Sequence, residues 1–279
     1  MNELQTFLFE HHSIRGALVR LTETWQQIVA QHRYPAEVRD LLADGVAATA
    51  LLASGLKSRP KVSLQLQGSG PVRLLVIQCS ANLEVRGMAQ WRPYARGDAM
   101  LGEGRLTVNL DTGARVFQGI VPLAGVRLDA CLEAYFAQSE QLPTRVVLAG
   151  TAASAAGLLV QALPGRDRDG AVFEHVAALA KTVTARELNV EPASALLPRV
   201  FDGYAIRLFR PRPVLHDCRC TPEHLARVAR MLGAEELESL LDDVGCVELT
   251  CEFCNRAFRY GAADVAAILR GEAPELSLH

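Results

Sequence analysis

The sequence contains no apolar run that reaches the roughly 18–20 residues a membrane-spanning helix needs. It has no surplus of positive charge either: 29 Lys and Arg stand against 31 Asp and Glu, a formal net charge of -2, which leaves no overall basic footprint for nucleic acid. Its first residues, MNELQTFLFEHH, lack the basic segment, apolar core and small-residue cleavage site of a secretory signal. These absences predict a cytoplasmic protein whose partners are neither membranes nor nucleic acids.

Cysteine is scarce in most of the chain and concentrated near its end. Of the seven cysteines, Cys79 and Cys131 stand alone in apolar segments, where core packing is the expected role. The other five lie in the segment 218–279: Cys218, Cys220, Cys246, Cys251 and Cys254. A secreted disulfide scaffold would be short and would spread its cysteines over the fold. Clustered cysteines in a chain predicted to be cytoplasmic favour a metal site or redox chemistry.

The remaining composition is that of a globular α+β protein. A hydrophobic fraction of 49% and a charged fraction of 22% over 279 residues predict one large domain or two unequal ones. Apolar residues spaced by three and four predict an amphipathic helix through Ile14, Leu18, Leu21, Trp25 and Ile28, and further helices are expected at 36–56 and 128–138. Strands are expected at 62–66, 72–78, 84–91, 105–110, 114–123, 144–149 and 157–163. Consecutive hairpins predict a mostly antiparallel sheet with packed helices.

The character of the chain changes after Leu163. A charged segment with many helix breakers, residues 164–170, marks a predicted domain boundary. Helical character follows over 171–201, but the apolar stripe is thin, and Pro192 and Pro198 are expected to cut its later part into short pieces. Helices this short are marginal in water unless they dock on a folded neighbour. We therefore predict a core domain at 1–164, a metastable helical linker at 165–217 and a small domain at 218–279.

The last of these parts has a compact predicted plan. Thr221 and Pro222 suit the N-cap and first position of a helix that ends before Gly233. A helix at 234–241, strands at 247–250 and 257–260, and a closing helix at 262–270 complete it. A domain of this size has too little core to be stable without a staple, and its cysteines are the candidates.

The spacing of four cysteines is typical of a zinc site. Cys218-x-Cys220 is followed after 30 residues by Cys251-x-x-Cys254, so two close thiolate pairs flank a helical excursion. Asn255 follows the second pair, at a position where such turns often need a positive φ, which Asn tolerates. Zinc contributes about 10–16 kcal/mol of apparent binding free energy in small zinc modules, more than a core of this size supplies.

Two interpretations of this zinc site follow from the residues alone. In the first, the zinc is purely structural. In the second, the site is a redox switch, because a Cys-x-Cys disulfide closes a small, strained ring, and strained disulfides tend to be labile or regulatory. Oxidation of both pairs would then remove the staple of a domain that cannot hold itself together.

The chain resembles the heat shock protein 33 family of redox-regulated chaperones (33 kDa chaperonins). The resemblance rests on Cys218-Arg-Cys220 and Cys251-Glu-Phe-Cys254 and on four N-terminal segments in family order: LQLQGSGPVRLLVI (64–77), FQGIVPL (117–123), ACLEAYFAQSEQLPTR (130–145) and GLLVQALP (157–164). It covers nearly the whole chain. It implies an α+β core, a metastable linker and a C-terminal zinc domain.

The same resemblance implies a function and a set of site residues. The zinc ligands would be Cys218, Cys220, Cys251 and Cys254, and the disulfides of the oxidised form would be Cys218–Cys220 and Cys251–Cys254. Reduced, zinc-bound protein would be inactive. Oxidation under unfolding stress would release zinc, unfold the linker and yield a dimeric, ATP-independent holdase for unfolded client proteins, which is not an enzyme. Cys246 has no place in this signature; it suits a small buried residue, or competes for a disulfide.

Two other functions stay open at this point. A zinc-ribbon-like binding module is disfavoured as a nucleic-acid binder, because residues 218–279 hold six Arg and no Lys against eleven Asp and Glu, a balance of 6 − 11 = −5. A dithiol oxidoreductase would place Cys251-x-x-Cys254 at a helix N-terminus, whereas here the motif joins two predicted strands.

Overall fold

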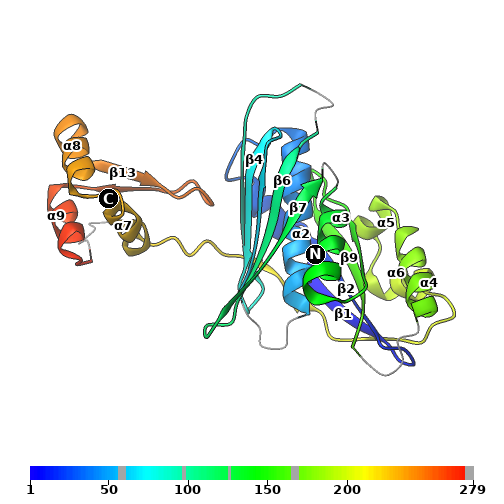
Figure 1. The fold of residues 1–279 in the computed structure, drawn as a ribbon. Helices are drawn as coiled ribbons and strands as arrows, with labels where there is room; N and C mark the ends of the chain where they lie inside the picture. The colour runs from blue at the N-terminus through cyan, green and yellow to red at the C-terminus, as the bar shows by residue number, and fades with distance from the viewer. Residues whose placement is uncertain (56–60, 96–98, 125–126, 165–169, 274–279) are drawn as a thin grey trace. The chain divides into compact units, whose positions relative to one another are not determined.

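The computed structural model describes residues 1–55, 61–95, 99–124, 127–164 and 170–273 (Figure 1). The chain divides into two units, Met1–Asp217 and Cys218–His279. Among the described residues, no helix combines the length and the apolar character that crossing a membrane requires. The predicted linker, 165–217, lies within the first of these units.

The described residues of the first unit form two mostly antiparallel sheets that lie on either side of a long helix. Sheet A has the strand order β10 (Ile206–Leu208), β1 (Asn2–Phe9), β2 (Ile14–Leu21), β9 (Ala155–Ala162) and β8 (Thr144–Leu148), with β11 (Arg212–Pro213) also paired to β1. Sheet B has the order β12 (Leu215–His216), β5 (Glu84–Trp91), β4 (Val72–Cys79), β3 (Lys61–Gly68), β6 (Glu103–Asp111) and β7 (Val116–Ala124). The pairing of β12 with β5 is parallel, and the other pairings are antiparallel. The α+β class and the mostly antiparallel arrangement predicted from the sequence are confirmed.

The predicted helix through residues 14–28 is wrong. The segment forms strand β2 followed by the short helix α1 (Glu23–Val29), and β2 pairs with both β1 and β9. Seven of the eight residues of β2 are buried, because one face packs on the helices between the sheets and the other on α4–α6. A strand buried on both faces shows no alternation of apolar and polar residues, and its apolar positions matched helical spacing by coincidence.

Helix α2 (Ala36–Ser54) occupies the space between the two sheets (Figure 1). Eleven of its residues are buried, and they contact strands of both sheets. Because a helix buried all round needs small side chains where the sheets approach, six alanines and Gly45 suit this position. Helix α3 (Leu128–Tyr135) and the π-helical turn η1 (Phe136–Glu140) follow β7, so the predicted helix over 128–138 is found with a different last turn.

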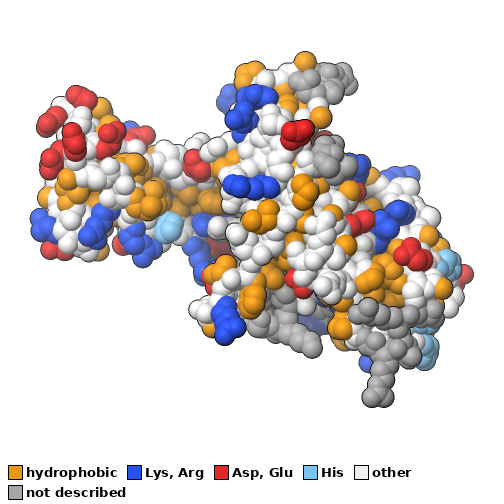
Figure 2. Space-filling model, viewed as in Figure 1, with side chains coloured by type: hydrophobic (Ala, Val, Ile, Leu, Met, Phe, Trp, Pro, Cys, Tyr) orange, Lys and Arg blue, Asp and Glu red, His pale blue; other side chains and the backbone are white. Residues whose placement is uncertain are grey.

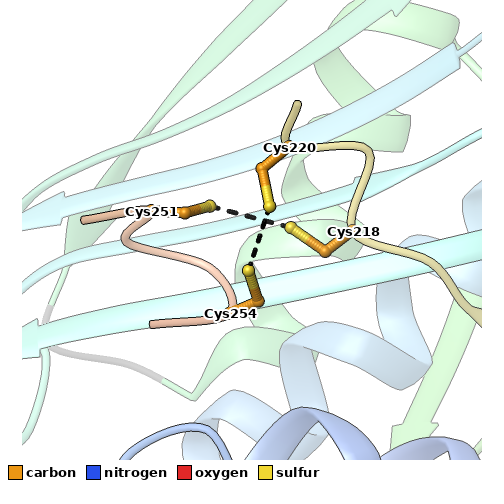
Figure 3. Close-up of side chains that lie close together, drawn as sticks. All are labelled: Cys218, Cys220, Cys251 and Cys254. Atoms are coloured by element: carbon orange, nitrogen blue, oxygen red, sulfur yellow. Dashed lines mark hydrogen bonds between the residues drawn. The ribbon is translucent and has the colours of Figure 1, made fainter. Parts of the chain in front are cut away.

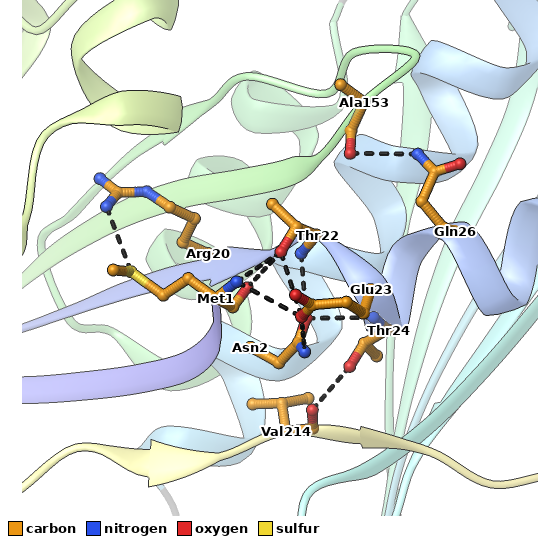
Figure 4. A network of polar contacts seen from close by, with 9 residues as sticks. All are labelled: Met1, Asn2, Arg20, Thr22, Glu23, Thr24, Gln26, Ala153 and Val214. Atoms are coloured by element: carbon orange, nitrogen blue, oxygen red, sulfur yellow. Dashed lines mark hydrogen bonds and ion pairs between the residues drawn. The ribbon is translucent and has the colours of Figure 1, made fainter.

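Hydrogen bonds at the start of α1 and β1 connect the first residues of the chain to residues far along the sequence (Figure 4). The side-chain carbonyl of Asn2 accepts hydrogen bonds of 3.0 Å from the backbone N–H groups of Thr22 and Thr24. The buried hydroxyl of Thr24 donates to the carbonyl of Val214, at 2.8 Å. The side chain of Asn2, from β1, thus accepts hydrogen bonds at the N-terminal end of α1, and Thr24 attaches the segment around Val214 to this helix.

Three short helices cover the face of sheet A that points away from α2 (Figure 1). They are α4 (Gly170–Lys181), α5 (Ala185–Val190) and α6 (Ala193–Val200). Together with Phe7, Phe9 and Leu18 of the sheet they form a second core. Pro192 separates α5 from α6 as expected, whereas Pro198 lies inside α6 and does not interrupt it.

Over its described residues, 218–273, the second unit forms three helices around a two-stranded hairpin. Its elements are α7 (Pro222–Arg230), α8 (Ala234–Val244), β13 (Val247–Thr250), β14 (Ala257–Tyr260) and α9 (Ala262–Arg270). The order and type of all five were predicted, although α8 runs to Val244 and α7 ends at Arg230. Its core is small and is built around Leu237, Tyr260 and Ile268, with Cys220 and Cys251 among its buried members.

Candidate metal centre

The hairpin β13–β14 holds Cys251 and Cys254 in a tight turn. The backbone N–H of Cys251 donates to the carbonyl of Arg256 at 2.9 Å, and the N–H of Asn255 donates to the carbonyl of Cys251 at 2.8 Å. Asn255 has φ = 55°, the left-handed conformation that its place after the second cysteine predicts. The turn thereby brings both cysteines of the pair to one end of the hairpin.

The other two cysteines immediately precede helix α7. The hydroxyl of Thr221 accepts a hydrogen bond of 3.2 Å from the N–H of His224 and caps the helix, with Pro222 at its first position, as predicted. The buried Tyr260 donates from its hydroxyl to the carbonyl of Pro222 at 2.8 Å. This bond fixes the start of α7 against strand β14 and therefore positions Cys220 beside the hairpin.

The structure brings the sulfur atoms of Cys218, Cys220, Cys251 and Cys254 together (Figure 3). All four Sγ atoms lie within 4.8 Å of one another, with 3.1 Å between Cys220 and Cys254 and 3.7 Å between Cys218 and Cys251. Ligands at about 2.3 Å around a tetrahedral zinc would be about 3.8 Å apart. The spacing of the sulfurs therefore fits a four-thiolate metal site, and all seven cysteines of the chain are free of disulfides.

Two of these sulfurs differ in how readily they lose a proton. Burial, together with hydrogen bonds to Cys254 and Cys218, raises the pKa of the Cys220 thiol. Burial acts in the same sense on Cys254, but hydrogen bonds from Cys220 and from the backbone N–H of Arg256 outweigh it and lower that pKa. The lowered pKa of Cys254 suits a metal ligand, because the thiolate is the form that binds metal.

Charge on the second unit is unevenly distributed. Helix α8 carries Glu235, Glu236, Glu238, Asp242 and Asp243, and Figure 2 shows acidic side chains gathered over it. Basic side chains occur elsewhere on the unit, for example Arg259, whose Nε lies 2.6 Å from the carboxylate of Glu248. The surface over α8 would repel a phosphate backbone.

The remaining residues considered from the sequence lie outside the cluster. Cys79 and Cys131 are buried in the first unit, as expected. Cys246 is half-buried immediately before β13 and is not part of the four-sulfur group.

Two polar features of the first unit were missed in the sequence. Strand β2, IRGALVRL, carries Arg15 and Arg20, and both side chains make hydrogen bonds inside the fold. Two arginines in an otherwise apolar segment are the signal that could have revealed them, since a charged residue in a buried strand needs internal partners.

The fold and the cysteine cluster define an α+β protein with a small C-terminal module whose four clustered cysteines could hold a metal ion. A family model described as Hsp33 protein matches residues 2–261. A 33 kDa chaperonin from Shewanella woodyi is 39% identical over 280 residues, covering 98% of both chains, and one from Nitrosococcus oceani is 39% identical over 268 residues, covering 95% of this chain and 93% of that one. The chain belongs to the Hsp33 family.

A solved structure supports the fold independently. The crystal structure of a 33 kDa chaperonin, a heat shock protein 33 homologue from Thermotoga maritima, superposes with a TM-score of 0.83 at 22% identity and covers 97% of this chain and 99% of its own. The sequence resemblance to this chaperone family is confirmed by these matches.

Proposed function

We propose that this chaperone-family protein is a redox-regulated, ATP-independent holdase that is inactive while its four cysteines are reduced and bound to zinc. The observation that carries the proposal is the convergence of four cysteine sulfurs within 4.8 Å in a unit whose own core is small. Four thiolates with no oxygen ligand favour zinc over the hard cations magnesium and calcium. A bound Zn²⁺ would hold the two cysteine pairs together and so staple α7 to the hairpin.

The proposed switch is the oxidation of both cysteine pairs. Each pair of thiolates would lose two electrons as its S–S bond forms, and one hydrogen peroxide would take up these two electrons and two protons from the solvent to give two water molecules. The family resemblance assigns the pairs as Cys218–Cys220 and Cys251–Cys254. Disulfide sulfur is a poor metal ligand compared with thiolate, so oxidation and zinc binding exclude each other.

The proposed consequence is loss of the C-terminal fold, followed by unfolding of the linker at 165–217. Helices α4–α6 are six to twelve residues long, and helices of this length are marginal unless docked. Their release would expose the apolar face of sheet A that carries Phe7, Phe9 and Leu18. An exposed apolar surface of this kind can hold an unfolding client protein.

The same proposal covers partners and location. We infer that the clients are unfolded or partly unfolded proteins, that the oxidised form is a homodimer, and that the protein acts in the cytoplasm without nucleic acid, membrane or enzymatic turnover. The division into a core at 1–164, a linker at 165–217 and a redox domain at 218–279 belongs to this proposal. Cytoplasmic action fits the switch, because thiols stay reduced there until oxidative stress.

The decisive experiment counts zinc and thiols in the full chain before and after hydrogen peroxide treatment at raised temperature. We expect one zinc and seven free thiols when reduced, and no zinc and three free thiols when oxidised. Only the oxidised protein should suppress the aggregation of a chemically denatured client. A zinc that stays bound through oxidation would favour a structural site, and catalytic turnover of a disulfide substrate would favour an oxidoreductase.

A further inference from the structure

A pocket in the first unit has polar residues at its base and apolar walls. Its volume is about 450 Å³, within the range of pockets that hold small organic molecules. Arg15, Gln161 and Glu140 supply its charged and polar lining, and the apolar lining includes Leu52, Leu110 and Phe136. The pocket lies where strand β2, the end of helix α2 and the turn η1 meet, and it is separate from the cysteine cluster.

The polar base is built from neighbouring strands of sheet A. Arg15 faces Gln161 across β2 and β9, and Gln161 faces Thr144 across β9 and β8. The guanidinium of Arg15 donates from Nε and Nη2 to the side-chain oxygen of Gln161, at 2.9 and 2.6 Å. The amide nitrogen of Gln161 donates to the hydroxyl of Thr144 at 2.8 Å, and this hydroxyl donates to the carbonyl of Leu142 at 2.9 Å. This chain fixes both the amide of Gln161 and the orientation of the guanidinium.

The third nitrogen of Arg15, Nη1, has no hydrogen-bond acceptor among the described residues, and no carboxylate of that part of the chain lies within ion-pair distance of the guanidinium. Arg15 packs so closely on Gly55, at the end of α2, that a Cβ there would collide with it. The negative end of the helix dipole therefore favours the cation, but it supplies only a partial charge. Burial lowers the pKa of Arg15, because its positive charge is poorly solvated.

Glu140, the one acidic residue among the described lining residues, has a different environment from Arg15. Glu140 is exposed, and its carboxylate accepts a hydrogen bond of 3.1 Å from the hydroxyl of Tyr135. Its charge is therefore screened by water, whereas the charge of Arg15 lies deeper, beside apolar walls. The pocket thus offers an inner cation, an apolar body and an outer carboxylate.

We propose that this pocket binds a small organic carboxylate with an apolar body. The carboxylate would accept from Nη1 of Arg15, and the apolar body would lie against Leu52, Leu110 and Phe136. Charge-assisted hydrogen bonds from a guanidinium held in place in this way are stronger than neutral ones. The outer Glu140 is placed to distinguish a simple carboxylate from one that also carries an ammonium group.

Three ligands of matched shape test the proposal on the reduced full chain by titration calorimetry. We expect 3-phenylpropionate to bind at least tenfold more tightly than 3-phenylpropan-1-ol, which lacks the carboxylate. L-phenylalanine adds an ammonium group: tighter binding than phenylpropionate would assign Glu140 to that group, and weaker binding would assign the pocket to simple carboxylates. Equal affinity for the acid and the alcohol, or no binding of the acid at a Kd of about 1 mM or below, would overturn the proposal.

Variants locate the binding within the chain. Arg15→Met removes the cation and Gln161→Glu neutralises it with an ion pair, so each should weaken phenylpropionate binding at least tenfold. Arg207→Met, which removes an exposed arginine of β10, should leave binding unchanged. Circular dichroism establishes that each variant is folded, and the comparison of ligands on the unchanged chain decides the matter if Arg15→Met does not fold. Undiminished binding to folded Arg15→Met would place the carboxylate elsewhere and refute the site.

Discussion

The guanidinium of Arg20 donates a hydrogen bond of 2.7 Å from Nε to the carbonyl oxygen of Leu188. Arg20 belongs to the central strand β2 and is only 2% exposed, whereas Leu188 lies in helix α5 of the predicted linker. A second guanidinium nitrogen of Arg20 donates to the carbonyl of Glu191 just beyond α5. A six-residue helix is thus held on the core by a buried cation at its C-terminal end, where the helix dipole favours positive charge.

We predict that Arg20→Met releases this helix. Removal of the donor leaves the buried carbonyl of Leu188 unpaired, which costs about 1–3 kcal/mol. Methionine keeps the length and apolar stem of the side chain, so the core of sheet A should survive. Limited proteolysis of the reduced protein should cut the segment around α5 at a lower temperature than in the unchanged chain, and the zinc content should stay the same.

The matched control is Arg199→Met. Arg199 pairs with Glu187 and Glu191 at 2.8 Å but is half exposed, and exposed pairs contribute about 0–1 kcal/mol. Arg199→Met should therefore lower the temperature at which the protease cuts much less than Arg20→Met does. If both variants resisted the protease as the unchanged chain does, the docking of α5 would not depend on Arg20.

The sequence was informative where one physical rule dominated the local structure. Strands β3 to β9 and helix α2 lie where alternation, turn residues and helical spacing predicted them. The hairpin β1–β2 was missed, because burial of both faces removes the alternation that identifies a strand. Gly16 shows what the pattern could not reveal: it leaves room for the ring of Phe7 on the paired strand, a contact set only by the three-dimensional pairing.

The candidate metal centre was more predictable than the rest of the molecule. Cysteine spacing and the needs of a small domain were enough to select Cys218, Cys220, Cys251 and Cys254, which the structure brings together. The pocket at Arg15 was not predictable, since its residues are distant in sequence and meet only through the register of β2, β9 and β8. Local chemistry can be read along the chain, whereas a site assembled by strand pairing requires the fold.

The turn that carries Cys251 and Cys254 leads to a prediction at Asn255. Its positive φ costs an ordinary L-residue about 1–2 kcal/mol, and asparagine bears the conformation better than most. We expect Asn255→Gly to keep zinc affinity and Asn255→Val to lower it several-fold. A β-branched side chain strongly disfavours the left-handed backbone conformation of this residue. Competition with a chromophoric chelator measures both affinities, and equal affinities for the two variants would show that the turn does not control the site.

We predict that the stability of the first unit depends on pH because of the carboxylate of Asp44. Its carboxylate accepts a hydrogen bond of 2.7 Å from the N–H of Gly150, but burial dominates and raises its pKa to about 6. Arg127 opposes this rise, while Asp129 and Asp40 add to it. Because the pKa is higher in the folded than in the unfolded chain, stability falls as the pH rises from about 4 to 6 and stays reduced above that.

Asp44→Asn removes the charge and keeps an acceptor for Gly150. We expect it to raise the free energy of unfolding by about 1–3 kcal/mol at neutral pH and by less than about 1 kcal/mol near pH 4. Urea unfolding followed by the fluorescence of the chain's two tryptophans, Trp25 and Trp91, reports on this unit. Asp202→Asn, at an exposed position, is the control and should change neither value. If Asp44→Asn raised the free energy of unfolding equally at both pH values, the buried charge of Asp44 would not be the cause.

We predict that the second unit folds only when metal is bound. Variants of two cysteines, one inside the cluster and one outside it, separate loss of a metal ligand from loss of a thiol in general. Cys220→Ser removes one of the four clustered sulfurs, whereas Cys246→Ser removes a half-buried sulfur outside the cluster. Loss of a supporting residue around a metal costs about 10–100-fold in affinity, so loss of a ligand should cost more than 100-fold.

Because metal binding and folding are linked, Cys220→Ser and the chelated unchanged protein should share one outcome: loss of the helical signal of α7, α8 and α9. Cys246→Ser should retain both zinc and that helical signal. Removal of zinc by a chelator should abolish the signal of Cys246→Ser as it does in the unchanged protein. Zinc analysis and far-ultraviolet circular dichroism measure the two properties on the same samples. A Cys220→Ser protein that keeps one zinc, or a metal-free chain that keeps a folded second unit, would contradict the assignment of these sulfurs as the staple of the domain.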